Sequence, residues 1–185
     1  MLKDIYKEAE ARMRGAIQAL EEDLGGIRTG RASPALIEKL QIEYYGTLTP
    51  LIQLAAISVP EPRSLMIRPF DASTLKSIDR AIMASDLGLT PNNDGKTIRL
   101  NLPPLTEERR KELVKVVHQR VEEARVATRN VRRDSIRDLR EFMDEKLISE
   151  DDLKRGEEEL QKITDRFIEE INTIGDHKEK EILEV

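Results

Sequence analysis

Apolar residues recur at helical spacing over the first 29 residues of the chain. They fall near one face of a helix: Ile5, Met13, Ile17, Leu20, Leu24 and Ile27. The pair Gly25-Gly26 interrupts this pattern, because each glycine weakens a helix by about 1 kcal/mol relative to alanine. We therefore predict a helix over residues 2–29, with a weak point or a close approach of another helix near its end.

Two longer helices are predicted after residue 105. Thr106 is a good N-cap, and Glu107 and Glu108 complement the dipole of a helix that runs to about residue 146. Its apolar stripe contains Leu113, Val117, Val121, Ala124, Thr128, Val131, Ile136, Leu139 and Met143. Ser149, followed three residues later by Asp152, begins the last helix. Its core residues repeat at bundle spacing: Leu153, Leu160, Ile163, Phe167, Ile171 and Ile174.

Between residues 30 and 104 the pattern changes from helical spacing to alternation. Apolar and polar residues alternate over 40–44, 57–59, 65–67 and 98–102, and glycines and prolines separate these runs. Short strands joined by turns are therefore predicted. Residues 73–87 have helical spacing, and Gly88 is placed as a C-terminal stop. This segment is predicted to be a small mixed α/β unit.

These elements predict an α+β fold with two domains. The first helix cannot bury its apolar stripe alone, so we assign residues 1–29 and 106–185 to a long three-helix bundle. Residues 31–104 then form a small inserted β/α/β domain. The two connections between the domains are short and contain glycine and proline, and we predict a hinge there, formed by Gly30, Arg31, Pro103, Pro104 and Leu105.

Composition narrows the class of protein. Charged residues make up 36% of the chain and aromatic residues only 3%, a profile that suits helix packing better than a sheet sandwich. The absence of cysteine excludes disulfides and thiolate metal sites. No apolar run approaches the roughly 20 residues of a membrane span, and the N-terminal residues lack the apolar core of a signal peptide. We expect a cytoplasmic protein without a membrane partner.

Motifs for catalysis, metal binding and cofactor binding are weak. Gly95-Lys96-Thr97 lacks the spacing and the following helix of a phosphate loop. His118 and His177 belong to no catalytic or metal motif, and we interpret both as surface residues. The acidic runs 150–152 and 157–159 lack the spacing of a calcium loop. We therefore predict no catalytic residue, no metal, no cofactor and no small-molecule substrate.

Charge is distributed unevenly along the chain. The net charge is −5, yet residues 106–140 carry 11 basic and 7 acidic side chains, whereas residues 141–185 carry 7 and 16. Arg125, Arg129 and Arg132 fall on one helix face at i, i+4 and i+7, and residues 125–133 contain no acidic residue. This face is either solvated or a phosphate-binding surface. The planar guanidinium group suits phosphate, and without aromatic residues the face would contact the backbone of structured RNA or DNA.

Five motifs in order resemble the ribosome recycling factor family, and together they cover essentially the whole chain. They are IRTGRASP at residues 27–34, EYYGT at 43–47, AIMASDLGL at 81–89, PPLTEERRK at 103–111, and ARVA at 124–127 followed by RNVRRD at 129–134. The resemblance implies an L-shaped molecule made of a three-helix bundle and a small inserted domain.

The resemblance also implies a function. Members of the family bind the large ribosomal subunit after termination and, with elongation factor G and GTP hydrolysis, split the ribosome into subunits. The bundle's arginines would contact 23S-type ribosomal RNA, and the inserted domain would be the mobile arm. By this resemblance the RNA-binding residues are Arg132 first, then Arg129, Arg110 and Arg28, with Arg133 and Arg31 as weaker additions. We expect a monomer that is not an enzyme.

One alternative class stays open from the residues alone. A helical-bundle adaptor or scaffold protein without a ribosomal role would have a similar composition and the same long helices. Its signature would be a stripe of apolar residues left exposed beyond the bundle seams, and the sequence contains no clear stripe of that kind.

Overall fold

The computed structural model describes residues 1–184, which form two compact units. The helical unit consists of Met1–Leu24 and Val114–Lys180. The sheet unit consists of Gly25–Leu113 together with the residues from Glu181 onward. The first turns of the long helix that begins at Glu107 and the last turn of the one that ends at Leu183 therefore belong to the sheet unit by their contacts. The predicted boundaries at residues 30–31 and 103–105 stay a prediction.

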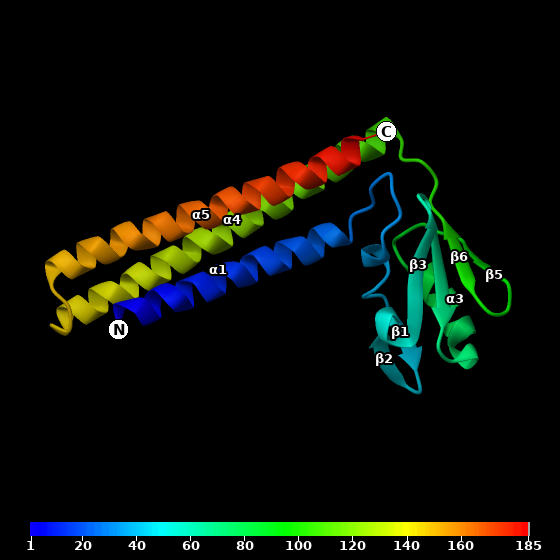
Figure 1. Cartoon of the computed structure of the whole chain (residues 1–185), viewed down its shortest axis with the longest axis horizontal. Coiled ribbons are helices and arrows are strands. Elements are labelled where there is room, and N and C mark those ends of the chain that lie inside the picture. Colours follow the sequence, from blue (N-terminus) through cyan, green and yellow to red (C-terminus); the bar gives the residue numbers. More distant parts are fainter. Residues whose placement is uncertain (185) are drawn as a thin grey trace. The chain divides into compact units, whose positions relative to one another are not determined.

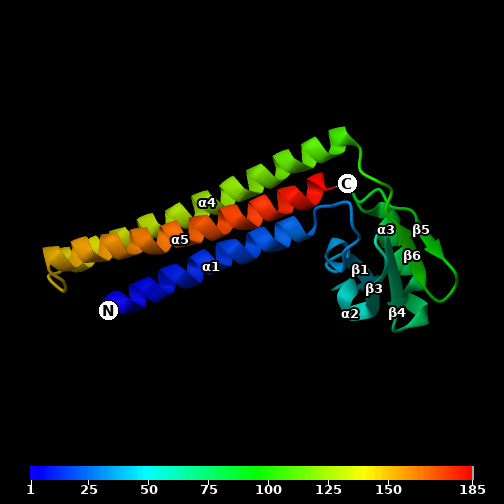
Figure 2. The same cartoon turned by 45° about the horizontal axis from the view of Figure 1, so that its top comes forward.

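The helical unit contains three long helices that lie side by side (Figures 1 and 2). They are α1 (Leu2–Gly25), α4 (Glu107–Asp144) and α5 (Glu150–Leu183). Ion pairs join α1 to both partners, because Arg12 contacts Asp134 at 2.8 Å and Arg14 contacts Glu170 at 2.6 Å. The α+β class and its long helices are confirmed.

Both helix starts predicted from the sequence are confirmed by their cap hydrogen bonds. The backbone N–H of Arg109 donates to the Thr106 hydroxyl at 3.1 Å, which satisfies one of the free donors at the start of α4. At the start of α5, the Asp152 N–H donates to the Ser149 hydroxyl and the Ser149 N–H donates to the Asp152 carboxylate, each at 3.1 Å. This reciprocal pair fixes the beginning of the last helix.

Two details of the predicted helices are wrong. α1 ends at Gly25 instead of residue 29, and Ile27 lies half-buried outside it. The two consecutive glycines end the helix there. The apolar stripe predicted for α4 included Ile136, but Ile136 is only half-buried, and its neighbour Ser135 is the buried residue at this point of the stripe. Ser135 lies four residues from both Val131 and Leu139 and so continues their stripe, whereas Ile136 is rotated away from it.

Two glycines of α5 let α4 approach closely. A Cβ at Gly175 would lie 2.6 Å from Cγ2 of Val121, and a Cβ at Gly156 would lie 2.7 Å from Cδ1 of Leu139. Neither distance is tolerated by a real Cβ atom. Leu139 can turn its flexible end away, but Val121 is branched at Cβ and has little freedom at χ1. Gly175 is therefore the stricter requirement for packing between α4 and α5.

We expect Gly175→Ala to destabilise the protein by about 1–2 kcal/mol, because overpacking of a core outweighs the gain in helix propensity. Gly15 in α1 provides a matched control, because it is exposed and its added Cβ would meet no atom within 4 Å. Gly15→Ala should stabilise by about 0.5–1 kcal/mol. Urea unfolding of both variants measures the two effects. Equal shifts in the same direction would contradict the close approach.

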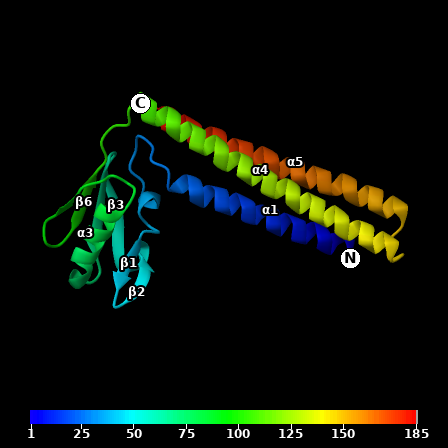
Figure 3. The ribbon, with the colours of Figure 1, turned by 180° about the vertical axis from the view of Figure 1, so that it is seen from behind.

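The sheet unit, seen from behind in Figure 3, is built on a four-stranded antiparallel sheet with the order β3-β4-β6-β5. Its strands are β3 (Ala55–Glu61), β4 (Ser64–Pro69), β5 (Pro91–Asn93) and β6 (Ile98–Asn101). A separate hairpin pairs β1 (Gln41–Tyr44) with β2 (Thr47–Pro50), and the short helix α2 (Leu51–Leu54) follows it. The four predicted strands are present, whereas β2 and β5 were not predicted.

One face of this sheet is covered and carries the core of the unit. Strands β4 and β6 bury Leu65, Ile67, Ile98 and Leu100 there, together with residues of α3 (Leu75–Ala84). α3 ends before the predicted stop at Gly88, because the N–H of Ser85 already turns back to the Ile82 carbonyl at 3.2 Å. The alternation of each strand thus places every second residue on the opposite, open face.

Candidate nucleic-acid interface

The arginines of α4 fall on one face, as their spacing predicts, but they differ in their partners. Glu122 receives hydrogen bonds from Arg125 at 3.0 Å and from Arg129 at 3.2 Å. Arg125 also donates to the Asn172 side chain of α5 at 2.8 Å. The hydrogen bonds from Arg125 and then from Arg129 lower the pKa of the Glu122 carboxyl, which keeps it ionised. One carboxylate therefore partly neutralises two of the arginines.

Arg132 has a different environment. Its guanidinium donates to the side-chain oxygen of Gln161 on α5, and its Nε is buried without a hydrogen-bond partner. Within residues 1–184 no carboxylate pairs with it. Gln161 in turn donates to Asp165 at 2.7 Å, so the neutral amide separates the arginine from that acid. Arg132 therefore carries a positive charge that no carboxylate in the described residues offsets, and its planar guanidinium suits a phosphate group.

Arg133 lies on an exposed part of α4 and donates to the Asn130 side chain. Its neighbour Asp134 is held by Arg12 at 2.8 Å and by Arg137 at 3.5 Å. The Arg12 hydrogen bond is the main cause of the lowered pKa of Asp134. The Asp134 carboxylate therefore links α1 to α4 through its ion pair with Arg12, and Arg133 is exposed to solvent beside it.

Two other predicted arginines belong to the sheet unit and bind backbone carbonyls. Arg28 donates to the carbonyl of Pro103, which ties together the two chain segments of the predicted hinge. Burial, and then the nearby charge of Arg109, lowers the pKa of Arg28. Arg110 donates to the carbonyls of Leu183 and Glu184, at 3.3 and 3.2 Å. It thereby satisfies free carbonyls at the end of α5.

The remaining hinge residues lie close to the β3–β4 turn. The N–H of Ala32 donates to the Pro62 carbonyl at 2.7 Å, and the N–H of Leu102 donates to the Arg63 carbonyl at 2.8 Å. Arg31 is exposed, lines a cavity of about 480 Å³ together with Gly30, and has its backbone N–H bonded to the Thr29 hydroxyl. Pro104 is exposed and Leu105 half-buried. Both connecting segments are thus fastened to one turn of the sheet unit.

The structure therefore places the predicted site residues in two groups. Arg129, Arg132 and Arg133 belong to the helical unit, whereas Arg28, Arg31 and Arg110 belong to the sheet unit. The carbonyl contacts of Arg28 and Arg110 were not foreseen, because sequence spacing gives no signal for them. The RNA-binding role of all six stays a prediction.

Metal binding and membrane insertion find no support in the described residues. Within residues 1–184 no group of three or more histidine, aspartate or glutamate side chains is arranged to hold a metal ion. His118 instead contacts Glu179 at 2.9 Å on the surface between α4 and α5. No helix in this part of the chain combines the length and apolarity needed to cross a bilayer.

Comparison with known proteins gives consistent matches. A family model described as "Ribosome recycling factor" matches residues 20–183. The ribosome-recycling factors of Roseiflexus castenholzii and Syntrophomonas wolfei are 56% and 57% identical to this chain, over 100% of both chains in each comparison.

Solved structures agree with these sequence matches. A solution structure of a ribosome recycling factor has a TM-score of 0.79 at 47% identity and covers 100% of this chain and 98% of its own. A structure of the T. thermophilus factor, described with E. coli elongation factor G on the E. coli post-termination complex, has a TM-score of 0.69 at 48% identity, with full coverage of both chains.

Proposed function

Because this chain belongs to the ribosome recycling factor family, we propose that it splits the post-termination ribosome into subunits together with elongation factor G and GTP hydrolysis. The observation that carries the proposal is the match over both units of the chain, at up to 57% identity over full length. The relative from T. thermophilus is described together with elongation factor G on such a complex, which supports the same partners here.

In this proposal the helical unit is the anchor. Arg132, with Arg129 beside it, binds phosphates of 23S-type RNA in the large subunit. The support is local: Arg132 is charged and half-buried, and no carboxylate in the described residues pairs with it. Counterion release makes such contacts favourable and dependent on salt. Arg28 and Arg110 contribute mainly by holding backbone segments in place.

The sheet unit is the moving part. Gly30, Arg31 and residues 103–105 form the hinge, and motion comes from GTP hydrolysis by elongation factor G. This chain then needs no catalytic residue, metal or cofactor, and it acts as a monomer in the cytoplasm, where its ribosome is. A non-ribosomal adaptor would need an exposed apolar stripe on the long helices, and within residues 1–184 the large hydrophobic residues exposed there are only the separate Val116, Val126 and Leu183.

Glu122 competes with phosphate for Arg125 and Arg129. We expect Glu122→Gln to tighten binding to the large subunit about two- to fourfold, since exposed ion pairs of this kind are worth at most about 1 kcal/mol. Glu123→Gln is the matched control, because it makes the same charge change one residue along and releases Arg120 and the neutral Gln119 instead of Arg125 and Arg129. Co-sedimentation with large subunits at several salt concentrations measures both. Equal gains for the two variants would contradict the competition.

The proposed function is tested by sedimentation of post-termination ribosomes through a sucrose gradient. With this chain, elongation factor G and GTP present, we expect free subunits. Omitting any one component should leave the ribosomes whole. Intact ribosomes in the complete mixture would contradict the proposal.

A further inference from the structure

The open face of the four-stranded sheet is polar and basic. Strand alternation places Ser58, Met66 and Arg99 in one row across this face, because Ser58 pairs with Met66 and Met66 pairs with Arg99. Asn92 continues the row on β5 through its pairing with Arg99. The apolar residues on either side of Met66 and Arg99 point to the covered side.

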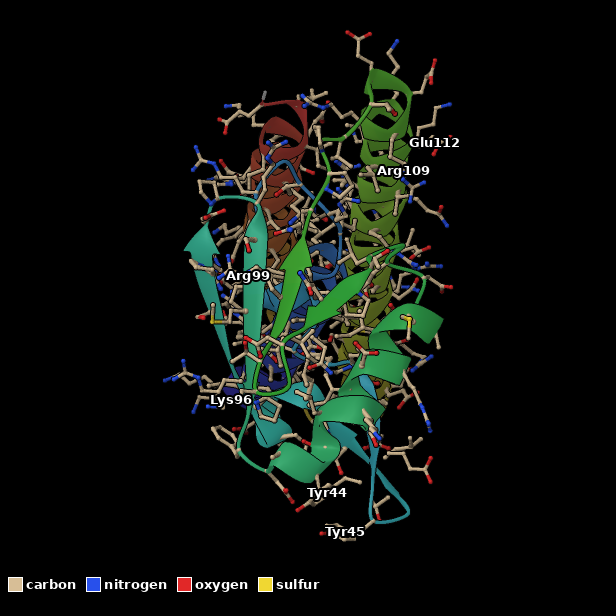
Figure 4. All side chains as sticks on the ribbon, turned by 90° about the vertical axis from the view of Figure 1, so that its right-hand side faces the viewer. Tyr44, Tyr45, Lys96, Arg99, Arg109 and Glu112 are labelled. Carbon is tan, nitrogen blue, oxygen red and sulfur yellow. The ribbon has the colours of Figure 1, made fainter. Side chains whose placement is uncertain are left out.

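Three cations gather on this face. Arg68 follows Met66 by two residues on β4, which makes it the diagonal neighbour of Arg99, at a backbone separation of about 7–8 Å. Lys96 lies two residues before β6 in the β5–β6 turn, and Figure 4 shows it at that turn with Arg99 on the strand above it. Arg68 and Lys96 are exposed and Arg99 is half-buried.

These cations lack acidic partners. In the described part of the chain no ion pair involves Arg68, Lys96 or Arg99, whereas arginines of the helical unit pair with carboxylates repeatedly. The acids nearest in sequence bond to backbone N–H groups and not to these three side chains. Asp71 accepts the Ser73 N–H at 2.9 Å, and Asp94 accepts the N–H groups of Lys96 and Thr97, at 2.9 and 2.7 Å.

An exposed aromatic ring extends the same surface. Phe70 directly follows the last residue of β4 and lies two residues after Arg68. Its backbone is held by a hydrogen bond from its N–H to the Leu54 carbonyl at 3.0 Å, yet its side chain is 72% exposed. A large aromatic residue left in solvent beside three unpaired cations is the combination that binds a base and its neighbouring phosphates.

We infer that the open sheet face, formed by Arg68, Phe70, Lys96 and Arg99, binds unpaired RNA. The three cations contact successive phosphates, and one base stacks on Phe70. This contact lies on the sheet unit, uses none of the arginines of α4, and adds a second RNA-binding surface to the proposed function. If the sheet unit moves as proposed, this RNA contact would hold it at one end of its motion.

The test uses the full chain and a fluorescent single-stranded oligouridylate at low ionic strength, with binding read by anisotropy. Arg68→Glu combined with Arg99→Glu should weaken binding at least about tenfold and flatten its salt dependence. Phe70→Ala should weaken it about tenfold, the usual loss of one stacked base. The matched control is Lys76→Glu with Arg80→Glu, an equal charge change at exposed positions of α3. It should stay within about twofold of the parent chain.

Several results would overturn the inference. Equal losses in the α3 control would make the binding a general charge effect, and unchanged binding in Phe70→Ala would remove the stacked base. Polyglutamate competing as well as RNA would indicate an acidic protein partner instead. The sucrose-gradient assay of subunit splitting uses no oligomer, so failure of the proposed function and failure of this surface are distinguishable. A photoreactive phenylalanine at position 70, cross-linked in post-termination ribosomes, separates ribosomal from messenger RNA, and cross-links to protein alone would refute both.

Discussion

Arg132→Ala is expected to weaken binding to the large ribosomal subunit about tenfold at moderate salt and to reduce the salt slope by about one unit. The side chain has no carboxylate partner in the described residues, so within the chain its removal costs only the hydrogen bond to Gln161, and in the proposed function it removes one phosphate contact. Its buried Nε makes no hydrogen bond. We therefore expect a change in unfolding free energy below about 1 kcal/mol.

Co-sedimentation with large subunits over a range of salt measures this effect. Arg120→Ala is the matched control on the same helix, because Arg120 is exposed and pairs only with Glu123 at 3.0 Å. Arg132→Lys adds a second comparison. It keeps the charge but loses the planar fork and should give an intermediate affinity. Equal affinities of the parent chain and Arg132→Ala for large subunits would contradict the proposed role of Arg132 as a ribosomal anchor.

The second prediction with a large expected effect concerns the proposed hinge at Gly30, Arg31 and residues 103–105. A Cβ at Gly30 would lie 3.5 Å from the Glu184 carbonyl oxygen, so the backbones of the two residues are neighbours, as a disulfide between them requires. Because the chain has no cysteine, Gly30→Cys with Glu184→Cys introduces the only two thiols. We expect the oxidised form to bind large subunits normally but to split ribosomes at least about tenfold more slowly, since a tethered hinge blocks the conformational step.

Reduction provides the control within the same molecule. Adding dithiothreitol should restore the splitting rate, which separates the tether from the two substitutions. Normal splitting by the oxidised form would place the moving boundary away from Gly30. That outcome would favour a sheet unit that moves together with the last turn of α5, because the residues from Glu181 onward belong to the sheet unit by their contacts.

The fold could be predicted from the sequence wherever local chemistry decides the structure. Thr106 and Ser149 were identifiable because an N-cap needs only one side chain and its own backbone. β5 was missed because Pro91-Asn92-Asn93 has no apolar alternation, and its pairing with β6 depends on a partner that is distant in space until folding. The end of α1 was placed too late because Ile27 continued the apolar spacing past two glycines.

The sequence predicted that the arginines of the candidate site share one helix face, but it did not predict which side chains surround each of them. Spacing alone placed Arg125, Arg129 and Arg132 together. Glu122 is near these arginines on the same helix, so its pairing was open to prediction. The contact of Gln161 with Arg132 was not, because Gln161 comes from another helix. The acidic α5 is likewise partly explained by tertiary pairing, because Glu157 holds Arg140 at 3.0 Å and Glu170 holds Arg14.

The most direct test of an anchor that works with a moving arm is the rate of subunit splitting, followed by light scattering with elongation factor G and GTP. It compares the parent chain, Arg132→Ala and the oxidised hinge variant at increasing protein concentration. We predict that Arg132→Ala recovers the parent rate at saturation, because it lacks only affinity, whereas the tethered variant stays slow at every concentration. Recovery of the tethered variant at saturation, or no splitting by the parent chain, would contradict the account.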